Sequence, residues 1–304
     1  MAGFLSNLRR LPDRLARLEH RLEEAIAYFA GRSHPLHFTS CAYLGDHTAL
    51  TLLEGRLLVF VDTRGTDIAP HLMMHGTWEQ DDLRAFLRMV RPGDTVLDLG
   101  AHVGVYTLSA AAAVGPAGRV HAFEPNPRNA GLLARSLAVN GFIERAQVHL
   151  MAVGDADGAA TLLFETEWSG GGFLDAARAE AGMRADGRRA MTARVVALDG
   201  FFTDPAFRLD VAKLDIEGME GRALRGMRGL LERSPDARLM MEWAPGMLAG
   251  QGVPAAEVAA MLAGIGFRFW TIGAGGALTP LHAEALARIP DGIRNIIAAR
   301  GNPH

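Results

Sequence analysis

The chain has 304 residues, and its 49% hydrophobic content is enough for the core of one large domain with appendages. A net charge of −3 gives no basic face for a polyanion, so we expect no nucleic-acid partner. The single cysteine, Cys41, excludes an intramolecular disulfide and a cysteine-based zinc site. No apolar segment follows Arg9 and Arg10 as in a signal peptide, and no run reaches the ~18 residues of a membrane helix. We therefore expect a cytoplasmic protein without a transmembrane segment.

Residues 1–32 contain an apolar seam with intervals of three and four residues, which is typical of a coiled-coil helix. The seam consists of Leu8, Leu11, Leu15, Leu18, Leu22, Ala25 and Phe29. The narrow stripe favours an intermolecular coiled coil, and we expect a homo-oligomer through this helix, with a dimer as first choice. The alternatives are a helix packed on its own domain and a basic helix on a membrane surface, which the interspersed glutamates disfavour.

Residues 33–80 change character and predict a small antiparallel β unit. Short strands are expected at 40–44, 48–53 and 56–62, with tight turns between them. A helix over 81–90 then opens the third part of the chain, residues 81–304.

Residues 95–108 organise the rest of the sequence. An apolar run with one acid, Asp98, stops at Gly100 and is followed by a helical pattern, which predicts a buried strand, a glycine turn and a helix N-terminus. Such a turn brings backbone N–H groups and the positive helix end close to a ligand. Gly100 and Gly104 leave room where a Cβ would block that approach. Asp98 can accept hydrogen bonds from an ammonium or hydroxyl group.

Two later strands also end on acids. The strand predicted at 119–123 precedes Glu124, where a carboxylate can take both hydroxyls of a ribose. Nicotinamide and flavin sites have Gly-x-Gly-x-x-Gly in the first turn. This turn reads Gly-x-x-x-Gly, so the spacing does not fit those cofactors. After a helix over 127–140, a strand at 147–153 leads to Asp155, which can accept from an adenine amino group or be a plain turn residue.

The second informative stretch begins at Lys213 and reads Lys-Leu-Asp-Ile-Glu-Gly-Met-Glu. Residues 213, 215 and 217 alternate, so they share one face while the strand persists. Ligands in open α/β sheets bind beyond the carboxyl ends of strands, so Asp215 and Glu217 should point into the crevice. A purely structural Lys213–Asp215 ion pair is the alternative.

The remaining pattern completes an α/β sheet. Further strands are predicted at 211–214, 238–243, 267–272 and 293–300, and helices at 221–233 and 255–265. Short strands at 162–164 and 193–196 flank a glycine run at 169–172, and an Arg-rich stretch at 176–189 is expected to pass over the site. The sequence therefore predicts a Rossmann-like sheet of seven mostly parallel strands.

These motifs resemble the FkbM family of S-adenosylmethionine (SAM)-dependent methyltransferases over about residues 75–245. The resemblance rests on residues 98–107, on Phe123-Glu124-Pro125, on the block from Lys213 to Glu220, and on the Gly76-x-x-Glu79 pattern upstream. The block is far more specific than the glycine turn, and His102 departs from the usual asparagine. The resemblance implies a class I methyltransferase fold, SAM as cofactor and O-methylation of a sugar or polyketide-type hydroxyl. The run from Tyr43 to Asp46 is similar to members linked to bacterial surface glycans, which favours a sugar.

The resemblance and the strand ends together assign the site residues. Cofactor binding is assigned to Glu79, Asp98, Gly100, Ala101, His102, Gly104, Tyr106, Thr107, Glu124, Pro125, Asp155 and Asp215. Candidate general bases for the hydroxyl are Glu217, Asp215, His75 and Glu242, in falling order.

Two other function classes compete with sugar or small-molecule O-methylation, and a metal site is a separate alternative. A divalent ion held by Asp215 and Glu217 is conceivable, but no metal site is assigned. A non-catalytic SAM-binding assembly module is the second function class, which the acids at four strand ends argue against. Methylation of nucleic-acid bases is disfavoured because the chain lacks an Asn/Asp-Pro-Pro-Tyr/Phe stretch.

Overall fold

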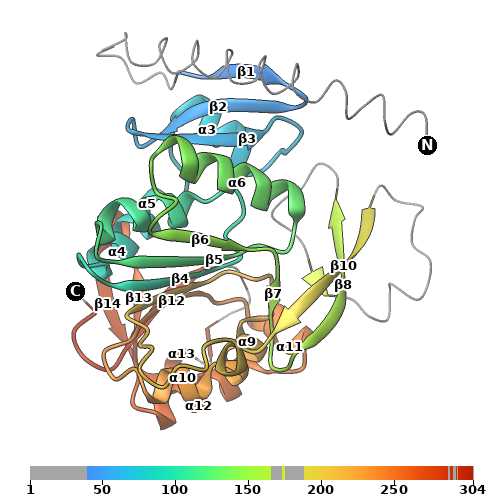
Figure 1. Cartoon of the computed structure of the whole chain (residues 1–304). Coiled ribbons are helices and arrows are strands. Elements are labelled where there is room, and N and C mark those ends of the chain that lie inside the picture. Colours follow the sequence, from blue (N-terminus) through green and yellow to red (C-terminus); the bar gives the residue numbers. More distant parts are fainter. Residues whose placement is uncertain are drawn as a thin grey trace.

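A computed structural model describes residues 40–165, 173–174, 188–286, 288–289, 292 and 294–303 (Figure 1). The helix expected over 1–32 and the dimer expected through it lie outside the described residues, as do the glycine run and residues 176–187 of the Arg-rich stretch. Within the described part, no helix has the length and apolarity that crossing a membrane requires.

The central element is an eight-stranded sheet with the order β14-β13-β15-β12-β11-β4-β5-β6. Its strands are β4 (Thr95–Leu99), β5 (Arg119–Phe123), β6 (Ala146–His149), β11 (Val211–Leu214), β12 (Arg238–Glu242), β13 (Arg268–Ile272), β14 (Leu278–Leu281) and β15 (Asn295–Ala299). The run from β12 to β6 is parallel, and β15 is inserted antiparallel between β12 and β13. The seven predicted strands are present, and β14 adds an eighth as a hairpin partner of β13.

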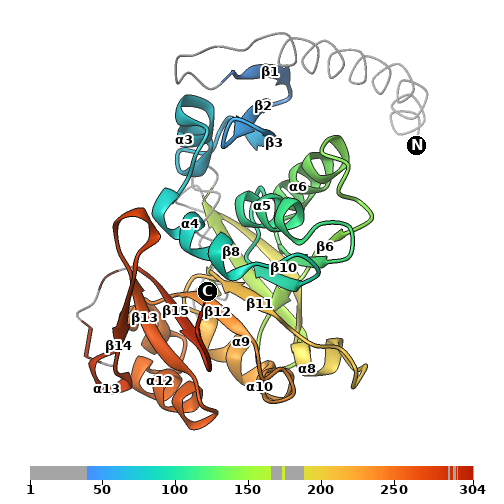
Figure 2. The same cartoon turned by 90° about the vertical axis from the view of Figure 1, so that its left-hand side faces the viewer.

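Helices cover both faces of this sheet (Figures 1 and 2). One face carries α4 (Gln80–Met89), α5 (Val105–Val114) and α6 (Pro127–Val139). The other carries α8 (Leu198–Phe201), α9 (Glu220–Gly226), α10 (Arg228–Glu232), α11 (Pro245–Gly250), α12 (Ala255–Gly264) and α13 (Ala283–Leu286). Each face of the sheet has its own hydrophobic core, and alternate residues of a strand point to opposite faces. In β4, Val96 packs in the core on the α5 side, and Leu97 and Leu99 pack in the core on the α9 side.

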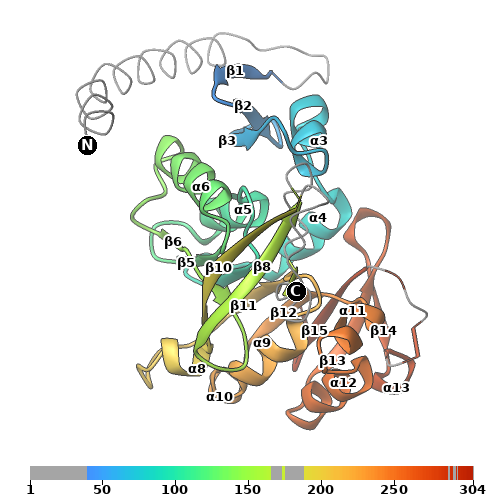
Figure 3. The ribbon, with the colours of Figure 1, turned by 90° about the vertical axis from the view of Figure 1, so that its right-hand side faces the viewer.

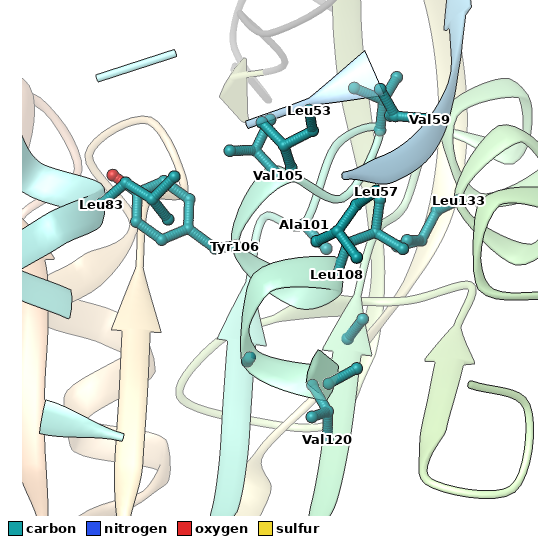
Figure 4. Close-up of a cluster of buried hydrophobic side chains, with 14 of the residues drawn as sticks. Leu53, Leu57, Val59, Leu83, Ala101, Val105, Tyr106, Leu108, Val120 and Leu133 are labelled. Atoms are coloured by element: carbon teal, nitrogen blue, oxygen red, sulfur yellow. The ribbon is translucent and has the colours of Figure 1, made fainter. Parts of the chain in front are cut away.

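A separate three-stranded antiparallel sheet, β1 (Ala42–Gly45), β2 (Thr48–Leu53) and β3 (Leu57–Asp62), lies over α6 (Figure 1). Figure 4 shows its Leu53, Leu57 and Val59 beside Val105 of α5 and Leu133 of α6, within one buried cluster. The small sheet and the first helical layer therefore share one hydrophobic core.

Polar contacts also join β3 to α6. The Asn140 side chain accepts from the backbone N–H of Leu58 at 3.0 Å and donates to the Leu58 carbonyl at 2.7 Å. The Ser136 hydroxyl accepts from the N–H of Phe60 at 2.9 Å. These bonds fix the small sheet on the helix that follows Glu124.

The strand expected at 147–153 is divided between two sheets. After β6 the chain turns, with Met151 N donating to His149 O at 2.8 Å, and β7 (Ala152–Val153) pairs with β10 (Arg188–Val196). Together with β8 (Gly158–Glu165) and β9 (Phe173–Leu174), these strands form the sheet β7-β10-β8-β9, whose long β8–β10 pair stands out in Figure 3. The prediction of one continuous strand was wrong, because after the turn the chain pairs with β10 instead of continuing beside β5.

Three further local differences concern helices. The helix expected at 221–233 is two helices, because Met227 between them leaves the helical conformation with φ −123°. Residues 68–75, expected within the β unit, form helix α3 (Ile68–His75). A short 3-10 turn, η1 (Ala274–Gly276), links β13 to β14.

Candidate active site

A cavity of about 450 Å³ lies at the carboxyl ends of β4, β5, β11 and β12. Its size falls in the range of small-molecule sites in proteins. The strands bring together residues that are far apart in sequence, from Thr66 to Glu242, so the sheet order builds the site.

The glycine turn after β4 forms one side of the cavity. Gly100 and Gly104 have φ values of 83° and 96°, which favour glycine. A Cβ on Gly100 would lie 1.9 Å from the carbonyl oxygen of Asp215, so the close approach of two chain segments also requires glycine. The amides of Gly100 and Ala101 both donate to the Phe123 carbonyl, at 2.9 and 3.0 Å. These two amides therefore serve the turn itself instead of facing a ligand as the sequence suggested.

Glu124 is 5% exposed and ties this turn to the next loop. Its Oε2 accepts from the N–H of His102, and its Oε1 from the N–H of Asn126, both at 2.8 Å. Burial raises the pKa of Glu124 to about 7 despite these bonds. Since each carboxylate oxygen can accept more than one hydrogen bond, both retain capacity toward the cavity.

Asp98 lies beneath the turn and is 1% exposed. Its Oδ2 accepts from the Thr107 hydroxyl at 2.5 Å, while its Oδ1 has no hydrogen-bond partner among the described residues. Burial raises its pKa. Thr107 is itself fully buried behind Asp98 and does not line the cavity, so it positions this acid.

A second group of side chains surrounds Lys213. Its Nζ lies 2.6 Å from Asp215 Oδ2 and 4.2 Å from the centre of the Tyr106 ring. The Tyr106 hydroxyl donates to Glu79 at 2.8 Å, and burial raises the pKa of Glu79. Burial opposes the charge on Lys213, but the carboxylates around it, Asp215 first, raise its pKa overall. The Lys213–Asp215 ion pair offered as the structural alternative is therefore present, inside the cavity wall.

Two further acids complete the wall. Glu217 stands in a left-handed conformation with φ 57°, directly before Gly218 with φ 91°. Burial, followed by repulsion from Asp215, raises the pKa of Glu217 to about 7. Glu242, at the end of β12, is 8% exposed, and burial together with repulsion from the neighbouring acids raises its pKa to about 9. A strained backbone at a carboxylate that lines a cavity is typical of a functional position.

Most of the residues assigned from sequence line this cavity. They are Glu79, Asp98, Gly100, Ala101, His102, Gly104, Tyr106, Glu124, Pro125, Asp215, Glu217 and Glu242. The structure does not bring three others to its wall. Thr107 is buried behind Asp98. His75 is exposed at the end of α3, and Asp155 faces Arg222, 3.4 Å from its guanidinium, because the chain leaves the main sheet before it.

Sequence reasoning missed other wall residues, above all His71 and Trp78, whose rings meet edge to face at 5.1 Å. His71 precedes His75 by one helical turn, so recognising α3 as a helix would have placed both on one face. Glu220, the last acid of the Lys-to-Glu block, is fully buried and accepts from the N–H of Ile216 at 2.7 Å. No cluster of three or more metal-ligating side chains exists in the portion of the chain described.

The reversed β15 within an otherwise parallel core, the glycine turn after β4 and the strand-end acids define a Rossmann-like methyltransferase of class I. The model of the methyltransferase FkbM domain matches residues 98–269, more than half of the chain. The chain therefore belongs to the FkbM methyltransferase family. No curated protein matches it.

Solved structures similar to the chain include a SAM-dependent O-methyltransferase from Thermotoga maritima, with 15% identity and a TM-score of 0.37. An FkbM methyltransferase from Methylobacillus flagellatus has 15% identity and a TM-score of 0.41. The alignments cover 72% and 70% of this chain, but only 64% and 49% of the two relatives.

Proposed function

We propose that this methyltransferase uses SAM to methylate a hydroxyl oxygen of a sugar. The observation that carries the proposal is the position of Glu217. A shielded carboxylate with a pKa of about 7 lines the same cavity as the glycine turn and Glu124. One cavity thus offers a cofactor cradle and a group able to take a proton near neutral pH.

The residues present fit SAM. The turn after β4 lines the cavity, and Glu124 keeps acceptor capacity for two ribose hydroxyls. The unpartnered Oδ1 of Asp98 suits an ammonium group. When bound, SAM supplies an electrophilic methyl group on a sulfonium, so the protein needs chiefly to align the acceptor oxygen and exclude water.

Among the acids, Glu217 fits best as general base. A group with a pKa near the working pH transfers protons well, and about 7 meets this condition. Glu242, with a pKa of about 9, holds its proton at neutral pH in the free protein and is therefore less suited to act as a base. The Asp215 carboxylate is held by the Lys213 ammonium, which suits it to orienting a ligand.

The cavity wall supports a sugar over a polyketide-type acceptor. Several carboxylates can hydrogen-bond to hydroxyl groups, while the rings of Trp78 and His71 offer an aromatic edge and face for an aliphatic ring surface. An acceptor with few hydroxyls would leave these buried acids without partners. A non-catalytic module would bear the cost of burying these acids without any function for them.

Calorimetric titration with SAM tests the cofactor assignment. We expect a dissociation constant in the micromolar range, about −8 kcal/mol. Glu124→Ala should weaken binding by roughly 1–3 kcal/mol, as loss of a charged hydrogen-bond acceptor does. Asp155→Asn is the matched control, because Asp155 lies outside the cavity wall and its loss should leave affinity unchanged. Equal affinities of all three proteins would refute the ribose assignment.

Formation of the demethylated product with a panel of free and nucleotide-linked sugars tests the chemistry. Glu217→Gln keeps the shape but removes the base, and should reduce turnover by about 10²–10⁴-fold at unchanged SAM affinity. Wild-type turnover should rise with pH through about 7, where Glu217 loses its proton. A loss of less than tenfold in the variant would place the base elsewhere.

A further inference from the structure

The cavity wall contains far more negative than positive side chains. Its carboxylates are Asp67, Glu79, Asp98, Glu124, Asp215, Glu217 and Glu242. Among the wall residues that the structure describes, Lys213 is the one lysine or arginine, and its Nζ is already 2.6 Å from Asp215. Like charges in a shielded site cannot all be ionised together, so the free cavity must hold protons.

Geometry identifies where such a proton resides. Glu242 is more than nine-tenths buried, and its Oε2 has no hydrogen-bond partner within the described residues. Three carboxylates repel its charge, Asp215 most strongly, then Glu220 and Glu217, and only Lys213 opposes them. Burying an unpartnered ionised carboxylate is expensive, whereas a protonated one is much cheaper to bury.

Glu217 belongs to the same system. Asp215 and Asp67 repel its charge, and Lys213 attracts it. Glu242 and Glu217 follow the adjacent parallel strands β12 and β11, at the opposite end of the cavity wall from Glu124. With strands about 4.8 Å apart, β12 lies about 14 Å from β5, so these two acids and Glu124 stand on opposite sides of the cavity.

We propose that Glu217 and Glu242 hold a proton in the free protein and give it up when a cationic methyl donor binds. These two acids would then select SAM over its demethylated product, which lacks the sulfonium charge. The inference rests on the proposed function, because it takes SAM as the ligand.

The charge balance follows through the reaction. The acceptor O–H bond breaks and its proton passes to Glu217, while the methyl–sulfur bond breaks, the oxygen–methyl bond forms, and the electron pair left on sulfur removes the positive charge. The carboxylates thus regain a proton as the ligand loses its charge. After the reaction the product has no sulfonium charge, and the carboxylates carry one negative charge fewer. The electrostatic attraction between cavity and ligand is therefore weaker, which favours product release.

Calorimetry in two buffers of different ionisation enthalpy at one pH measures the protons released on binding. At pH 7.5 wild-type protein should release roughly half a proton or more with SAM beyond what it releases with S-adenosylhomocysteine. The α-amino group of each ligand also titrates near this pH, at about 7.7–8.0, so variants are needed to isolate the protein's share.

Glu242→Gln is the decisive variant, and Glu217→Gln is the second. Each should reduce the SAM-linked proton release by at least half and bring the two ligands' affinities about threefold or more closer together. Asp155→Asn removes an acid outside the cavity wall and should leave both quantities unchanged. Proton release equal to wild type in both glutamine variants would overturn the inference. A wild-type protein that binds no SAM would instead refute the proposed function itself.

Discussion

Replacing Gly100 by alanine tests the close contact on which the site is built. The substitution has two costs. A non-glycine residue at φ 83° costs about 1–2 kcal/mol. In addition, the new Cβ would lie 1.9 Å from the Asp215 carbonyl oxygen, so the two chain segments must separate by about 1 Å. Such overpacking costs about 1–3 kcal/mol more. We expect Gly100→Ala to lose about 2–5 kcal/mol of unfolding free energy.

Gly141→Ala supplies the matched control. Gly141 has φ 71°, but a Cβ there would meet nothing within 4 Å, so only the conformational cost of about 1–2 kcal/mol applies. Urea unfolding of the two variants measures the difference, and calorimetry should show SAM affinity reduced more than tenfold in Gly100→Ala alone, because Asp215 moves. Equal destabilisation of the two variants, or unchanged SAM affinity in Gly100→Ala, would refute the argument.

Two further predictions concern buried charge. Arg238 is 2.9 Å from Asp94 in a pair almost closed to solvent, so Arg238→Ala should cost about 3–5 kcal/mol in denaturant unfolding, whereas Arg228→Ala, in an exposed pair, should cost at most about 1 kcal/mol. The rings of His121 and His149 meet at 3.1 Å, and burial lowers both pKa values, that of His121 to about 4. The folded state keeps both rings neutral, whereas the unfolded state takes up protons below pH 6.5. The free energy of unfolding is therefore unaffected above pH 6.5 and falls by about 2–3 kcal/mol toward pH 4.5. His121→Gln should flatten that pH profile, and an unchanged slope would exclude the pair as its source.

The sequence predicted the parts of the site that depend on local chemistry. The glycine turn of β4 and the alternation from Lys213 to Glu217 are visible because glycine and charged residues interrupt apolar strands. The parallel strands then bring those positions to one edge, as expected.

What the sequence could not show depends on tertiary pairing. The chain leaves the main sheet after β6 because β10 is available as a partner for β7, and this removes Asp155 from the cavity wall. Helix α3 contains Pro70 in its first turn, where proline is tolerated, yet the residue reads as a helix breaker. Because that helix was not predicted, His75 was named as a candidate base, whereas His71 is the histidine of α3 that lines the cavity.

The bonds between α6 and β3 have a consequence for assembly. The side-chain amide of Asn140 donates to and accepts from the backbone of Leu58, as a residue of an adjoining strand would. The Ser136 hydroxyl accepts from the N–H of Phe60, which points to the same side of β3. An open strand edge is a template on which foreign chains can add. Helix side chains occupy this edge of the small sheet, so the backbone groups of Leu58 and the N–H of Phe60 are not available for a foreign chain to pair with.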